Sequence, residues 1–115
     1  MLVKEIVDLI DGNVLMGEEN LTENIENAFS SDLMSDVLAH VGENVVLLTG
    51  LNNHQVIRTA EMLDLKAIVF VRGKIPDIDL LELAKENEIV IISTKHTLYT
   101  ASGILFGKGL AGIQI

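Results

Sequence analysis

Three short aliphatic runs that begin 22 residues apart constrain the fold of this chain more than any other feature of its sequence. The runs are Val45–Leu48, Ala67–Val71 and Ile89–Ile92. Their apolar residues do not alternate with polar ones, and such runs are typical of strands that are covered on both faces. The segments between the runs have helical periodicity, and 22 residues is about the length of one strand and one helix. We therefore predict parallel strands joined by helices.

The rest of the chain extends this pattern into one domain that spans residues 1–115, since 115 residues is the size of a single domain. The predicted architecture is a three-layer α/β/α fold with a central, mostly parallel sheet of four to six strands. Further elements are expected as helices at 2–10 and 33–41, strands at 14–16 and 25–29, helices after Asn52 or Asn53 and after Pro76-Asp77, a last helix from Ser93-Thr94 to Phe106, and a terminal strand at 111–115.

The net charge of −9 is concentrated in the first third of the chain. Residues 1–36 carry nine acidic residues against Lys4 alone, whereas residues 37–115 carry eight acidic and seven basic residues. An acidic surface repels phosphate, so neither nucleic acid nor an anionic membrane is expected as a partner. The acidic third is interpreted either as a solvated face or as a docking surface for a basic protein partner.

The composition also limits the compartment and the chemistry. No apolar run approaches the roughly 20 residues that cross a bilayer, and the N-terminus lacks the features of a secretory signal, so a cytoplasmic protein is expected. The chain contains no cysteine. Disulfides, thiolate nucleophiles, cysteine-ligated iron–sulfur clusters and cysteine-type zinc sites are therefore excluded.

Polar and basic side chains follow each of the three predicted strands. In open α/β sheets, ligands bind beyond the carboxyl ends of the strands, where helix N-termini expose free N–H groups. A phosphate or a nucleotide would suit the arginine and the lysines there. The candidate ligand-binding residues are Asn52, Asn53, His54, Arg72, Gly73, Lys74, Ser93, Thr94 and Lys95.

A purely structural interpretation of the same residues stays open. Polar residues collect in loops, Asn53, Ser93 and Thr94 are suited to capping helices, and a lysine at a helix start can simply extend into solvent.

No complete catalytic motif is present. The chain lacks the P-loop, the dinucleotide-binding glycine pattern and the Gly-x-Ser-x-Gly elbow, and its histidines show no close metal-ligand spacing. Asp32 and Asp36 lie one turn apart and could share a cation, but Asp32 is interpreted as a helix cap and Asp36 as exposed surface. We expect no catalytic residue, no metal and no cofactor, and therefore no enzyme.

The order of segments resembles the DRTGG domain from about residue 1 to residue 110. The resemblance depends on Ala28–Ala39, Arg72–Asp77 and Ile91–Lys95. DRTGG domains occur alone, inside some phosphate acetyltransferases and between the CBS domains of certain inorganic pyrophosphatases. They are similar in fold to the N-terminal domain of HPr kinase/phosphorylase. The resemblance implies a regulatory, dimer-forming module without known catalysis.

The sequence motif that names the family is degenerate here. Its aspartate-arginine pair corresponds to Asn52-Asn53, and its threonine-glycine-glycine corresponds to Val71-Arg72-Gly73, so only the last glycine remains. Gly73 is expected to be a turn residue with positive φ.

The residues and the resemblance together favour two alternative functions. The first is a non-catalytic regulatory or assembly module that forms a homodimer or another homo-oligomer. The small residues Ala101-Ser102-Gly103 and the apolar tail residues Ile113 and Ile115 favour it, because a monomer of this size would struggle to cover them. The alternative is a sensor of a nucleotide or phosphate metabolite that binds at the carboxyl ends of the strands.

Overall fold

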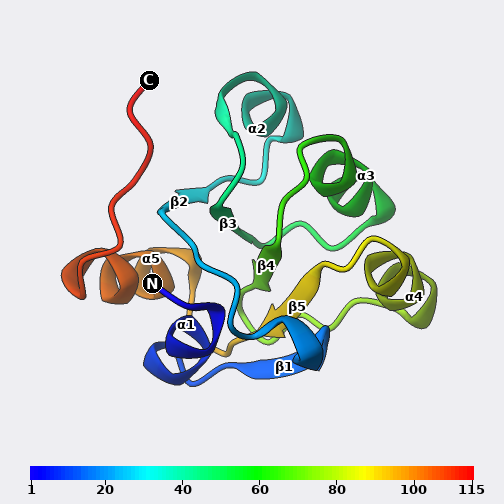
Figure 1. Cartoon of the computed structure of the whole chain (residues 1–115), viewed down its shortest axis with the longest axis horizontal. Helices are drawn as coiled ribbons and strands as arrows, with labels where there is room; N and C mark the ends of the chain where they lie inside the picture. The colour runs from blue at the N-terminus through cyan, green and yellow to red at the C-terminus, as the bar shows by residue number, and fades with distance from the viewer.

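The three aliphatic runs form adjacent strands of one sheet in the computed structural model, which describes residues 1–115 (Figure 1). They correspond to β3 (Val45–Thr49), β4 (Ala67–Phe70) and β5 (Val90–Ser93). β3 pairs with β4 and β4 pairs with β5, in both cases parallel. The prediction of parallel strands joined by helices is confirmed.

Two shorter strands form the edges of the sheet. β2 (Asn27–Ser30) lies parallel to β3, and β1 (Asn13–Met16) lies antiparallel to β5. The strand order is β1-β5-β4-β3-β2, so the sheet has five strands of which four are parallel. This agrees with the predicted mostly parallel sheet of four to six strands.

Helices cover both faces of the sheet, as the three-layer prediction requires (Figure 1). One face packs against α1 (Val3–Leu9) and α5 (Leu98–Gly107). The other face packs against α2 (Met34–His40), α3 (His54–Met62) and α4 (Ile78–Glu86). A short 3₁₀ helix, Glu18–Asn20, follows β1.

The absence of polar alternation in the central strands follows from this layering. Leu47 and Phe70 face the layer of α2, α3 and α4, whereas Val46 and Val69 face the layer of α1 and α5. All four side chains are fully buried. Because both faces of each strand need apolar residues, successive positions are aliphatic rather than alternating with polar ones.

The predicted helix starts are confirmed at two positions. The Asn53 side chain accepts a hydrogen bond from the Gln55 N–H at 3.0 Å and caps α3. The Asp77 carboxylate accepts one from the Leu80 N–H at 2.8 Å and caps α4. Each satisfies an N–H group that the first helical turn leaves free.

The predicted start of the last helix at Ser93-Thr94 is wrong. Ser93 is the last residue of β5, and α5 begins only at Leu98, with Thr97 as its cap. The Thr94 hydroxyl instead donates to the Ile10 carbonyl at 2.7 Å and so anchors the loop to the end of α1. The same hydroxyl accepts a local hydrogen bond from the His96 N–H at 3.3 Å, but no helix begins there.

The predicted terminal strand at 111–115 is reduced to one bridge between Ala28 and Gly112. Leu110 packs on the α5 side of the sheet and Ile113 on the α2 side. The tail therefore crosses the free edge of β2 instead of running along it (Figure 1, red). The strand expected at 25–29 is shifted to Asn27–Ser30.

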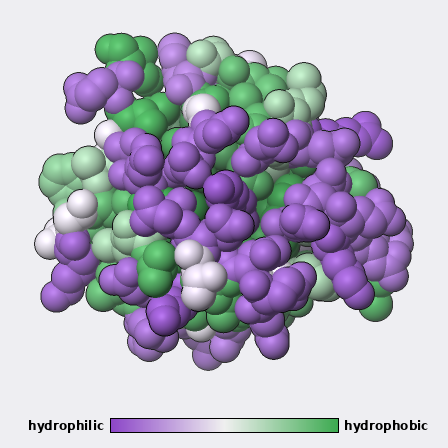
Figure 2. All heavy atoms as spheres, viewed as in Figure 1, coloured by the Kyte–Doolittle hydropathy of each residue, from purple (hydrophilic) through white to green (hydrophobic).

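No helix in the structure is long and apolar enough to cross a membrane. Hydrophilic residues cover much of the face shown in Figure 2, with hydrophobic residues between them. Paler residues of near-neutral hydropathy gather at the left edge, where Figure 1 places α5.

Candidate functional site

The loops that follow β4 and β5 are hydrogen-bonded to each other at the carboxyl ends of the strands. The Arg72 N–H donates to the His96 carbonyl and the Gly73 N–H donates to the Thr94 carbonyl, each at 2.8 Å. The Ser93 hydroxyl donates to the Lys74 carbonyl at 3.1 Å. Because parallel strands end at the same edge of the sheet, the structure brings these candidate residues together.

The loop after β3 joins the same edge. The Asn52 side-chain amide donates to the Ile75 carbonyl at 3.3 Å, and the His54 Nε2 lies 3.5 Å from an Asp77 carboxylate oxygen. Asn53 turns its side chain toward α3 as a cap. These three residues therefore tie the third loop to its neighbour and to the helix that follows.

Arg72 and Gly73 form the turn that follows β4. Both have positive φ, 59° for Arg72 and 68° for Gly73, so the predicted left-handed conformation of Gly73 is confirmed. The Arg72 guanidinium lies over Gly50, where an added Cβ would come within 2.8 Å of its Nη2 atom. Glycine at position 50 leaves the space that the guanidinium fills.

Asp32 lies at this edge and is not the helix cap that the sequence predicted. Its carboxylate accepts hydrogen bonds from the Gly50 N–H at 2.7 Å and the Thr49 hydroxyl at 2.9 Å. The Gly50 bond is the largest cause that lowers the pKa of Asp32; partial burial opposes it, and the Thr49 hydroxyl and the Arg72 charge reinforce it. Its position two residues after Ser30, the last residue of β2, was the sequence signal for this role.

The candidate residues differ in whether they remain free to bind a ligand. Ser93 and Thr94 are buried, and their hydroxyls are used inside the protein. Arg72, Lys74 and Lys95 are exposed. Neither of the two pockets in the structure is lined by these residues. The loops at the carboxyl ends of β3, β4 and β5, here called the carboxyl-end surface, are therefore a closed polar surface with basic side chains on it, rather than a cleft.

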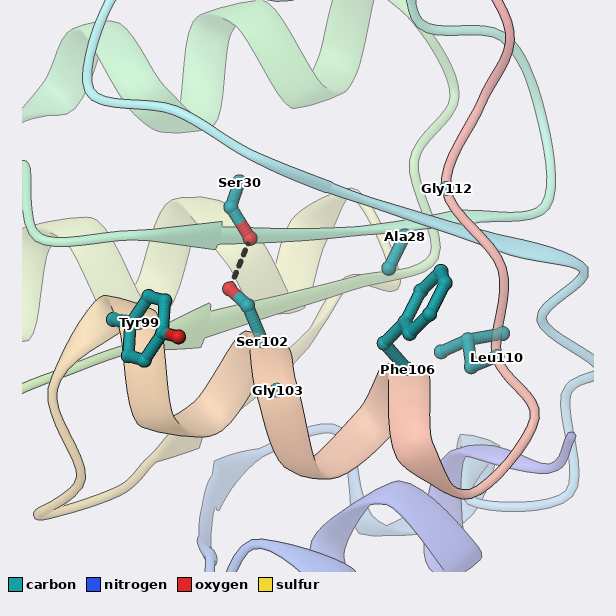
Figure 3. Close-up of a pocket in the computed structure, with 8 residues that line it drawn as sticks. All are labelled: Ala28, Ser30, Tyr99, Ser102, Gly103, Phe106, Leu110 and Gly112. Atoms are coloured by element: carbon teal, nitrogen blue, oxygen red, sulfur yellow. Dashed lines mark hydrogen bonds between the residues drawn. The ribbon is translucent and has the colours of Figure 1, made fainter.

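A groove of about 350 Å³ lies elsewhere, between β2 and α5 (Figure 3). The hydroxyls of Ser30 and Ser102 meet across it at 2.6 Å, and the aromatic rings of Tyr99 and Phe106 lie toward its two ends. The sequence drew attention to the small residues of this helix but not to the aromatic residues beside them. The complete lining consists of Ala28, Ser30, Tyr99, Ser102, Gly103, Phe106, Leu110 and Gly112.

The second pocket, of about 240 Å³, lies at the opposite ends of the strands and is strongly acidic. Lys66 is the one basic residue among its lining residues, and its ammonium lies 3.2 Å from a Glu23 oxygen. No group of three or more histidine, aspartate or glutamate side chains is arranged to hold a metal ion. The acidic lining residues are Glu23, Glu43, Asp64 and Glu88.

These features define a small α/β/α domain with a closed, polar carboxyl-end surface and an uncharged groove between β2 and α5. The family model for the DRTGG domain matches residues 5–106. The chain therefore belongs to the DRTGG domain family, and the resemblance seen in its sequence is confirmed.

A solved structure supports the fold. The chain is similar to a crystal structure of the CBS and DRTGG domains of the regulatory region of Clostridium perfringens pyrophosphatase, complexed with an activator, diadenosine tetraphosphate. The TM-score is 0.73 at 19% sequence identity, and the match covers 90% of this chain and 45% of the other. No curated protein matches the chain.

Proposed function

We propose that this domain is a non-catalytic regulatory module that acts by self-association. The observation that carries the proposal is the outer surface of α5, where Tyr99 is 89% exposed and Phe106 is 70% exposed beside the groove. Exposed aromatic side chains that border an apolar groove are typical of protein–protein contact sites. The occurrence of the DRTGG domain in the regulatory region of a pyrophosphatase supports a regulatory role.

Self-association predicts that the molar mass in solution rises with concentration. Sedimentation velocity or light scattering from the micromolar to the millimolar range is expected to show growth from the 12.5 kDa monomer toward a dimer. A mass that stays at 12.5 kDa over the whole range would contradict the proposal. Moderate salt should strengthen the association, because the contact surface is uncharged and salt screens the repulsion between two chains that each carry a net charge of −9.

A second candidate is a ligand sensor that uses the carboxyl-end surface. The observation that favours it is the exposed group of Arg72, Lys74 and Lys95 on hydrogen-bonded loops. The similar pyrophosphatase region is complexed with a nucleotide activator. Phosphate groups would meet the guanidinium and the ammonium groups here.

Thermal-shift screening with nucleotides and inorganic phosphate tests this second candidate. A ligand at 100 times its Kd should stabilise the fold by about 2.7 kcal/mol. The double variant Arg72→Ala with Lys95→Ala should lose that shift, whereas Lys85→Ala, on the distant part of α4, should keep it. If no compound raises the unfolding temperature, the sensor function is rejected.

A further inference from the structure

One face of α5 carries two exposed aromatic side chains with a shallow groove between them. Tyr99, Ser102, Gly103 and Phe106 follow one another at the spacing that places residues on the same side of a helix. All four line the groove, with the small residues between the two aromatic rings (Figure 3). A Cβ added to Gly103 would meet no atom within 4 Å, so the surface above it is open.

The same helix differs from the other α-helices in charge. α1, α2, α3 and α4 each contain at least one aspartate or glutamate, and α5 contains no charged residue. Two copies of a chain with a net charge of −9 repel each other. An uncharged surface is where two such copies can approach with the least electrostatic cost, because no like charges are desolvated there.

We propose that two copies pair through α5 against α5, antiparallel, about a two-fold axis that passes between Ser102 and Gly103. This inference rests on the proposed self-association and specifies its surface. Tyr99 lies three residues before Ser102, and Phe106 lies three residues after Gly103. The axis therefore places Tyr99 opposite Phe106 of the partner subunit, and this contact occurs twice.

The pairing satisfies what a symmetric interface requires. A two-fold contact uses the same surface on both copies, so that surface must be complementary to itself. Small residues at the crossing point let the two helix backbones approach closely, since interhelical distance depends on the side chains at the contact. Each aromatic ring then meets the aromatic ring of the other copy, an arrangement that aromatic pairs favour.

Complementary charges at the two aromatic positions test the pairing directly. Tyr99→Glu and Phe106→Lys each place a charge where the partner's aromatic ring would lie, so each variant alone should dimerise at least about tenfold more weakly than the wild type. Mixed in equal amounts, they should form a heterodimer, because one contact becomes Glu against Lys and the other keeps the original Tyr and Phe.

These substitutions should not destabilise α5 in the monomer. Tyr99 and Phe106 are mostly exposed, and a glutamate in the first turn and a lysine in the last turn both match the helix dipole. Circular dichroism should show unchanged folding. Stronger association of the mixture would be specific to the antiparallel pairing, because neither a parallel pair nor another surface brings positions 99 and 106 together. If the mixture associates no better than the separate variants, the antiparallel pairing is wrong.

Cross-linking gives a second readout, and the absence of cysteine from the chain makes it specific. Gly103→Cys places a thiol next to the proposed axis, within the range in which a disulfide can form, whereas Glu82→Cys on α4 places it on the opposite face of the sheet. Mild oxidation should give covalent dimer with the first variant and little with the second.

The outcomes separate the pairing from the proposed function. A wild-type protein that is a monomer at all concentrations contradicts both. A wild-type dimer whose Gly103→Cys variant gives no more cross-linked product than Glu82→Cys contradicts the α5 pairing and leaves self-association standing on another surface.

Discussion

Replacement of Phe70 by alanine is expected to lower the free energy of unfolding by about 3–5 kcal/mol. Phe70 heads the largest fully buried side chains, lies in the central strand β4 and packs in the cluster beneath α2, α3 and α4. Its removal loses apolar burial and leaves a cavity that rigid neighbouring strands cannot fill. Small domains have only about 5–15 kcal/mol of stability, so the variant should lose a large part of it.

Urea unfolding of the Phe70→Ala variant, monitored by circular dichroism, measures this effect. The matched control is Phe106→Ala, which removes the same atoms from a side chain that is 70% exposed. At a dilution where the wild type is monomeric, the control should change stability by roughly 0.5 kcal/mol or less. A loss below about 1 kcal/mol at position 70 would show that the core beneath α2, α3 and α4 is packed differently.

Replacement of Gly17 by alanine is expected to cost roughly 2–5 kcal/mol, because two unfavourable effects coincide. Gly17 has φ of +92°, a conformation that side chains rarely adopt. An added Cβ would also lie 2.8 Å from the Val90 Cα and 3.2 Å from the Ile89 carbonyl oxygen. Since these are backbone atoms of a strand and the residue before it, they cannot move aside cheaply.

Gly42→Ala is the control for Gly17→Ala. A Cβ at position 42 meets no atom within 4 Å, so the control should stay within about 0.5 kcal/mol of the wild type in the same denaturant titration. Gly17→Asn separates the two causes, because asparagine tolerates positive φ but carries the same Cβ. Equal stability of the Gly17→Ala variant and the wild type would mean that the turn after β1 is not held against β5.

The proposed regulatory role and the α5 pairing connect through the position of that helix. α5 packs on the sheet next to α1 and borders β2, whose free edge the C-terminal tail crosses. On the carboxyl-end surface, the Arg72 N–H donates to the carbonyl of His96, which lies in the loop that leads from β5 into α5. A ligand on that surface and a partner on α5 would therefore act on one continuous segment.

Much of the fold could be predicted from the sequence because its determinants are local. The runs around Leu47, Val69 and Ile91 are too short and too uniformly aliphatic for anything except strands covered on both faces. Helix starts could be predicted after Asn52 or Asn53 and after Pro76-Asp77, because these residues stand directly before helical apolar stripes; the structure assigns the caps to Asn53 and Asp77. The order of elements and the layers follow from these local patterns and from the short connections between them.

The misplaced details share one physical reason. Asp32 and Thr94 have side chains that can satisfy either a nearby helix N–H or a group far away in the chain. In the structure, the Asp32 carboxylate accepts a hydrogen bond from the Gly50 N–H, and the Thr94 hydroxyl donates one to the Ile10 carbonyl. Both bonds can form only after β2, β3, β5 and α1 are assembled. The sequence by itself determined which segments are strands and helices, because periodicity and capping act over a few residues. The tertiary structure alone decided which polar groups meet at the edge of the sheet and which face of α5 is left uncovered, because both depend on contacts between residues distant in sequence.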